Sequence, residues 1–118
     1  MLTEEQYKEN MIRMQEIVNN NTLLEKINWK LNKMSSRTKK NSCVLCKGGA
    51  VGVGMFLLHK SQNSRFNLKE DEERVYLYYI CERHAVELEV EGKELEVLKE
   101  IESKLADSYD SCVYVEIK

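Results

Sequence analysis

Apolar residues near the start of the chain recur at the three- and four-residue spacing of an amphipathic helix. Thr3 and Gln6 have the spacing of a capping box just before this pattern. The apolar positions are Tyr7, Met11, Met14 and Val18. The pattern therefore predicts a first helix that buries one face.

The asparagine run at 19–21 interrupts this pattern with poor helix formers. Thr22 and Glu25 then have the spacing of a second capping box, and helical spacing resumes up to residue 34. Its apolar positions are Leu24, Ile27, Leu31 and Met34. The segment 1–34 is thus predicted to be helical, either as a hairpin or as one long helix with a register shift. The long helix could form a homodimer as a short coiled coil.

Residues 35–42 are polar and basic and predict a linker. Beyond it, the Gly-rich apolar stretch 48–58 and the aromatic and β-branched stretch 75–80 predict a strand hairpin around a polar loop, 59–73. Residues 95–107 have helical spacing, and 112–117 alternate as a terminal strand does. The stretch 82–92 fits a helix or a strand equally well. Together these patterns predict an α+β fold.

The composition is that of a soluble globular protein: 118 residues, 42% hydrophobic and 32% charged, with a net charge of −2. The longest apolar run, 50–58, is too short to cross a bilayer, which needs about 20 residues. The first ten residues lack the pattern of a secretory signal, so we expect a cytoplasmic protein without membrane contact. The frequent Asn, Lys, Glu and Ile residues suggest an AT-rich genome, such as that of a phage or mobile element.

Two pairs of metal-ligand residues stand out from this background. Cys43 and Cys46 are separated by two residues, and so are Cys81 and His84. This spacing lets both side chains of a pair reach the same ion from one tight turn, and the predicted hairpin brings the two pairs together. The sequence therefore predicts a closed tetrahedral Zn²⁺ site, in which zinc stabilises the fold of a domain spanning 43–118.

Other interpretations of these residues remain. Cys43 and Cys46 could form a redox pair, although a thioredoxin-like site would open a helix where a glycine-rich run follows here. Cys81 could be an ordinary buried thiol, with His84 near a helix cap. His59 could contribute to the metal site, but we expect a loop or second-layer residue. Cys112 is expected to be a small core residue in a strand.

The two pairs and the hairpin between them resemble a treble-clef or zinc-ribbon-type zinc finger over about residues 43–90. This sequence differs from the usual first turn because Lys47 stands between the second cysteine and Gly48. The resemblance implies a metal-held scaffold. It implies no single role, because members of this class bind nucleic acids, bind proteins or only hold a scaffold.

Charge is unevenly distributed along the chain. Residues 1–65 contain 11 Lys or Arg against 5 Asp or Glu, whereas residues 66–118 contain 7 against 15. The segment 26–47 contains no acid and is a candidate patch that could bind phosphates, bind an acidic protein surface or only keep a linker solvated. Its candidate nucleic-acid-binding residues are Lys30, Lys33, Arg37, Lys39 and Lys40.

The sequence leaves three hypotheses about function. The first is a small non-enzymatic, zinc-stabilised regulator or inhibitor that binds another protein through its N-terminal helices and its acidic C-terminal half. The second is a nucleic-acid-binding protein that uses the basic segment 26–47 with exposed tyrosines. The third and weakest is a thiol-dependent redox enzyme. A closed shell with several thiolates disfavours a catalytic zinc, so we predict no enzymatic activity.

Overall fold

The computed structural model describes residues 2–105 and 111–118, and these residues form four α-helices and a three-stranded antiparallel sheet. The α+β class predicted from the sequence is thus confirmed. In chain order the elements are α1 Glu4–Val18, α2 Asn21–Ser35, the 3₁₀ turn η1 Thr38–Lys40, β1 Gly52–Leu57, the 3₁₀ turn η2 Lys60–Gln62, β2 Arg74–Ile80, α3 Glu82–Glu89, α4 Glu94–Leu105 and β3 Cys112–Glu116.

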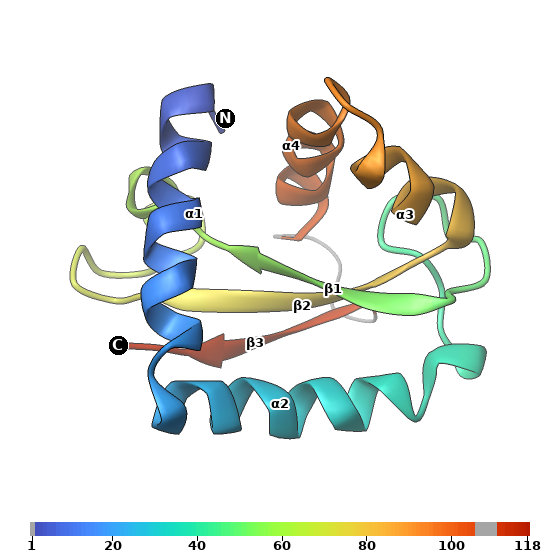
Figure 1. Ribbon diagram of the computed structural model, residues 1–118, viewed down its shortest axis with the longest axis horizontal. Helices are drawn as coiled ribbons and strands as arrows, with labels where there is room; N and C mark the ends of the chain where they lie inside the picture. The colour runs from blue at the N-terminus through green and yellow to red at the C-terminus, as the bar shows by residue number, and fades with distance from the viewer. Residues whose placement is uncertain (1, 106–110) are drawn as a thin grey trace.

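The sheet lies between helices, in the strand order β1-β2-β3 (Figure 1). In this view α2 lies below the sheet and α3 and α4 lie above it, while α1 reaches from the level of α4 down to the level of α2. The buried side chains accordingly form two clusters, one on each face of the sheet. The central strand β2 contributes to both clusters, and its residues 75–80 are all buried.

The two N-terminal helices begin and end at polar side chains. The capping box of α1 is confirmed, because Thr3 and Gln6 exchange side-chain to backbone hydrogen bonds. The expected break at 19–21 is also present, so the chain forms two helices rather than one long one. The predicted second cap is wrong: Asn20, not Thr22, accepts the cap hydrogen bond, from the N–H of Leu23. Asparagine is as good an N-cap as threonine and lies two residues earlier.

Both helices pack against the sheet. Ile17 of α1 and Ile27 and Met34 of α2 are buried in the cluster below the sheet. In the same cluster they meet strand residues that include Leu77 and Val115. The apolar stripe predicted for 22–34 is therefore the face with which α2 covers the sheet.

Close packing between β1 and β2 depends on one glycine. Gly54 lies opposite Tyr78 in the strand register. A Cβ atom at Gly54 would lie 2.4 Å from the ring of Tyr78, too close for any real contact. Tyr78 is 2% exposed. The absence of a side chain at Gly54 thus makes room for a large buried ring.

The stretch 82–92, which the sequence left open, is the helix α3 followed by a turn. Gly92 has a φ of 85°, a left-handed conformation that glycine adopts easily, and it separates α3 from α4. The predicted end of the next helix, at residue 107, lies outside the described residues. Within the described ranges, no helix combines the length and the apolar character needed to cross a bilayer.

Candidate metal centre

The first ligand pair lies in a tight turn, residues 43–48, which we call the knuckle. The N–H of Lys47 donates to the carbonyl of Cys43 at 3.1 Å, and the N–H of Cys43 donates to the carbonyl of Gly48 at 2.7 Å. Lys47 has a φ of 63°, in the left-handed region where glycine is common. The lysine that departs from the usual pattern therefore adopts the backbone conformation of a glycine. These hydrogen bonds bring both cysteines to one side of the turn.

The second ligand pair lies where β2 leads into α3. Cys81 follows the last residue of β2 and is the N-cap residue of α3, in an extended conformation. His84 lies in the first turn of α3, three residues after Cys81. Residues three apart share one face of a helix, so the sulfur and the imidazole point the same way. A strand that runs directly into a helix thus places these two ligands.

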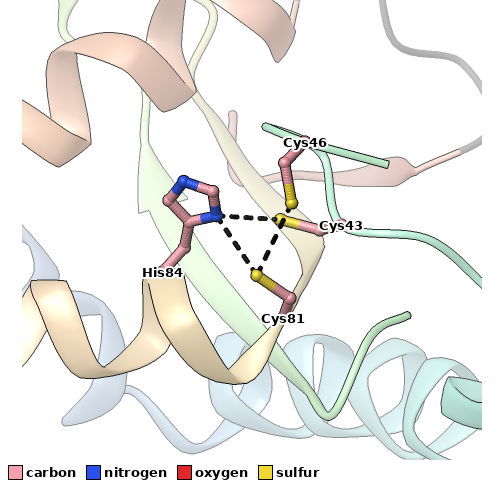
Figure 2. Close-up of side chains that lie close together, drawn as sticks. All are labelled: Cys43, Cys46, Cys81 and His84. Carbon is pink, nitrogen blue, oxygen red and sulfur yellow. Dashed lines mark hydrogen bonds between the residues drawn. The ribbon is translucent and has the colours of Figure 1, made fainter. Parts of the chain in front are cut away.

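The four side chains converge on one point (Figure 2). The Cys46 and Cys81 sulfurs are 3.6 Å apart, and His84 Nδ1 lies 3.2 Å from the Cys81 sulfur and 3.7 Å from the Cys43 sulfur. All four ligand atoms lie within 4.8 Å of one another. Ligands at tetrahedral Zn–S and Zn–N distances of about 2.3 and 2.0 Å would lie about 3.5 to 3.8 Å apart. The cluster could therefore hold one metal ion.

The surroundings of the cluster favour the charged form of one cysteine. Burial opposes ionisation of Cys43, but hydrogen bonds from the backbone N–H groups of Cys81, Leu45 and Cys46 and from the Cys81 side chain together lower the pKa of the Cys43 thiol to about 7. One of these groups, the N–H of Leu45, lies 3.4 Å from the sulfur. Burial instead raises the pKa of Cys81. Cys43 is thus ready to act as a thiolate ligand, and a bound cation would favour the thiolate form of Cys81.

Access to the cluster comes from one side. Cys43 and His84 are buried, whereas Cys46 is exposed. A Cβ atom on Gly48 would lie 3.3 Å from the Cys46 sulfur, so the absence of a side chain there leaves room beside this ligand. The knuckle therefore forms the solvent side of the site, and α3 and β2 form its inner side.

The other two candidate ligands lie outside this cluster. His59 is the N-cap residue of η2, and its ring nitrogens contact Glu9 at 2.7 Å and Ser61 at 2.8 Å. Cys112 lies in β3, where its sulfur donates to the carbonyl of Leu105 at 3.8 Å. Neither residue has a second cysteine or histidine two to five positions away in the sequence. The fold also places neither of them in the Cys₃His cluster.

The five predicted nucleic-acid-binding residues lie on α2, on η1 and, for Arg37, between the two elements. Lys30, Lys33 and Arg37 line one hollow together with Trp29, whereas Lys39 and Lys40 are exposed on η1 outside the lining of that hollow. The ammonium group of Lys33 lies 3.7 Å from the centre of the Trp29 ring. Sequence analysis missed Trp29, although its position among the lysines was a usable signal.

The fold and the site together define an α+β protein with a Cys₃His cluster able to hold a metal ion. Comparisons with protein-family models, with curated proteins and with solved structures found no match for this chain.

Proposed function

We propose that this chain is a small non-enzymatic protein in which the Cys₃His cluster holds structural Zn²⁺ and the surface binds another protein, as a regulator or inhibitor. The observation that supports this most is the position of the cluster. Its ligands come from the knuckle and from the β2–α3 junction, two segments that β1, the β1–β2 connection and β2 separate along the chain. An ion there would stabilise the fold.

The donor set favours zinc. Three sulfurs and one imidazole nitrogen suit a borderline-soft ion that prefers four tetrahedral ligands, and they suit Mg²⁺ or Ca²⁺ poorly because those ions prefer oxygen. The order knuckle, β1–β2 pair and ligand-bearing helix supports the resemblance to a treble-clef finger. The residues that would hold the ion are Cys43, Cys46, Cys81 and His84.

Metal analysis with cobalt substitution tests the metal assignment. We expect one zinc per chain after purification without a chelator. Cobalt in its place should give the intense visible bands of a tetrahedral site and the near-ultraviolet bands of bound thiolate. Cys81→Ser should weaken the thiolate bands, whereas Cys112→Ser should leave them unchanged. A purified protein without metal that cycles a disulfide between Cys43 and Cys46 would instead support the redox hypothesis.

The ligand count supports a structural rather than a catalytic role for the ion. A catalytic zinc keeps a coordination position for water, but four protein ligands close the shell, and thiolates reduce the Lewis acidity of the ion. Partner capture from the native source tests the interaction part of the proposal. The metal-loaded chain should retain a specific protein after nuclease treatment, and Cys81→Ser should not.

One observation favours nucleic-acid binding as a second candidate function. Trp29 on α2 is 58% exposed and lines a hollow together with Lys30 and Lys33 of the same helix and Arg37, which follows the helix. An exposed indole flanked by cations can stack on a base while the cations contact phosphates. Titration of binding to mixed DNA and RNA with salt tests this candidate. Affinity that falls steeply with salt would support it, and no binding even at low ionic strength would exclude it.

A further inference from the structure

β3 is an edge strand of the sheet, and no described strand pairs with its outer side. A groove of about 880 Å³ lies along this edge and is lined by residues of α2, the β1–β2 connection, β2 and β3. Its size is within the range of ligand-binding sites. Its lining includes Lys26, Trp29, Lys30, Arg65, Arg74 and Tyr114.

The strand register shows which backbone groups face this groove. The N–H of Tyr79 donates to the carbonyl of Ser111, and the N–H of Ile117 donates to the carbonyl of Glu73. Residues 111 and 117 thus direct their backbone groups toward β2. Because this direction alternates along an antiparallel strand, the N–H and C=O of Tyr114 and Glu116 point outward. The carbonyl of Glu116 already accepts a hydrogen bond from Lys26 Nζ at 2.7 Å, which agrees with that direction.

The charge of the groove is strongly positive. Four cations, Lys26, Lys30, Arg65 and Arg74, line it against one acid, Glu116. Of these cations, only Arg65 forms an ion pair with a residue in the described ranges, Glu102 at 3.7 Å. Cations around an exposed strand edge protect it from pairing with neutral or basic segments. The same cations complement an acidic segment.

We propose that the β3 edge binds an extended acidic peptide of a partner protein as a fourth strand of the sheet. The backbone of the peptide would pair with the outward N–H and C=O groups of Tyr114, and its carboxylates would lie near Lys30 and Arg74. This inference rests on the proposed function and names the chemistry of the partner. The edge favours a peptide over a nucleic acid because only a peptide backbone matches the groups of a strand edge.

The aromatic rings at the groove also favour a peptide over a nucleic acid. The guanidinium of Arg74 lies 3.9 Å from the centre of the Tyr114 ring, and the ammonium of Lys33 covers the Trp29 ring at 3.7 Å. Each ring therefore has one face occupied by a cation of this chain. These cations hold positive charge beside the edge and leave fewer ring faces for stacked bases.

Fluorescence anisotropy with a labelled short peptide of alternating glutamate and threonine tests the inference. Tyr114→Pro removes the outward N–H but no hydrogen bond to β2, and proline is tolerated at such edge positions. Loss of strand pairing should weaken binding about tenfold or more. Tyr114→Thr loses the ring but keeps the N–H, so it should bind within about threefold of the wild type. Equal binding by the two variants overturns the inference.

Substitution of charged residues provides a second, independent test of the inference. Lys30→Gln should weaken binding about tenfold, whereas Lys40→Gln, which removes the same charge outside the groove, should have no effect. A peptide of alternating lysine and threonine should not bind. Binding of oligothymidine in preference to the acidic peptide, or salt-sensitive self-association without peptide binding, overturns the inference in favour of a nucleic acid or a second copy.

Each variant is first checked for metal content and for the circular dichroism spectrum of the wild type. A metal-loaded protein that captures a host protein but no peptide overturns the edge inference and leaves the proposed function standing. A chain that binds neither peptide nor host protein contradicts both.

Discussion

At one end of the sheet, where β2 leads into α3, four metal-ligand side chains meet, whereas at the opposite end the chain is held by ion pairs and hydrogen bonds. The opposite end is the β1–β2 connection, residues 58–73, which we call the far end. Arg13 of α1 donates to both carboxylate oxygens of Glu73 there, at 2.7 and 2.8 Å. His59 contacts Glu9 of α1, and Arg65 pairs with Glu102 of α4.

The two ends of the sheet differ in the number of contacts that stabilise each of them. A single ion with four ligands can join segments far apart in sequence with a free energy of about 10 kcal/mol or more. A hydrogen bond to a charged group contributes about 1.5 to 3 kcal/mol when partly buried. The far end accordingly uses several separate contacts to α1 and α4, whereas the end with the Cys₃His cluster, which we call the metal end, would depend on that one site.

Removal of the proposed zinc ion should have the largest effect. Cys81→Ser, or treatment of the wild type with a chelator, should remove most of the folding free energy, since small domains are stable by only about 5 to 15 kcal/mol. Thermal melts followed by circular dichroism should show the loss, with recovery when zinc is returned to the chelated wild type. Cys112→Ser, outside the cluster, should melt within a few degrees of the wild type. Unchanged melting after chelation would show that the cluster is not a structural metal site.

The centre of the sheet, between the two ends, should be the next most sensitive region. Gly54→Ala would place a methyl group 2.4 Å from the Tyr78 ring, which is buried and cannot move freely. We expect a loss of about 2 to 3 kcal/mol in the free energy of unfolding, measured by denaturant titration. Gly52→Ala is a matched control in the same strand, because a Cβ there meets nothing within 4 Å. Equal effects of the two substitutions would contradict this packing argument.

The cluster and the far-end contacts differ in how well the sequence predicts them. Cys43, Cys46, Cys81 and His84 could be predicted because two chelating pairs carry their geometry in local spacing. The pairing of Arg13 with Glu73 joins residues 60 positions apart, and no local spacing marks it. Long-range partners of this kind depend on the packing of α1 against the sheet, which propensity and periodicity do not specify.

The prediction of secondary structure is limited in the same way, because some details depend on residues far apart in the sequence. The helices and the strand β2 lie close to their predicted bounds, but the strand predicted over 48–58 begins only at Gly52. The sequence also favours Thr22 over Asn20 as the cap of α2, because both residue types can cap. The role of Gly54 depends on which residue of β2 lies opposite it. Because residues 75–80 of β2 are all buried, the apolar pattern of this strand does not specify which residue pairs with Gly54.

Loss of one far-end contact should have a moderate effect. Arg13→Met removes the paired hydrogen bonds to Glu73 while keeping an unbranched side chain, and should lower the free energy of unfolding by about 2 kcal/mol. Arg13→Lys keeps the charge but not the two-point geometry and should recover only part of this loss. A double-mutant cycle with Glu73→Gln measures the coupling. A coupling near zero would show that the contact contributes nothing, as many surface ion pairs do.

The smallest expected effect is a gain rather than a loss in the free energy of unfolding, and it concerns Glu102. Glu102 is 1% exposed, and its Oε2 has no hydrogen-bond partner within the described ranges. Burial raises the pKa of this carboxyl, and Arg65 offsets that rise only in part. The folded state therefore prefers the protonated form, so this group stabilises the fold fully below its unfolded pKa, and the stabilisation is lost as pH rises through the folded pKa.

Glu102→Gln removes the ionisation while keeping the size of the side chain. At neutral pH the variant should be more stable than the wild type by about 1 kcal/mol, despite the loss of the pair with Arg65. The advantage should shrink as pH falls, because the wild-type carboxyl then becomes neutral as well. Denaturant titrations of both proteins at several pH values, with zinc in excess, measure the difference in the free energy of unfolding. Effects of pH on the metal end are common to both proteins and cancel in this difference. A variant less stable at neutral pH would show that the Arg65 pair outweighs burial of the charge.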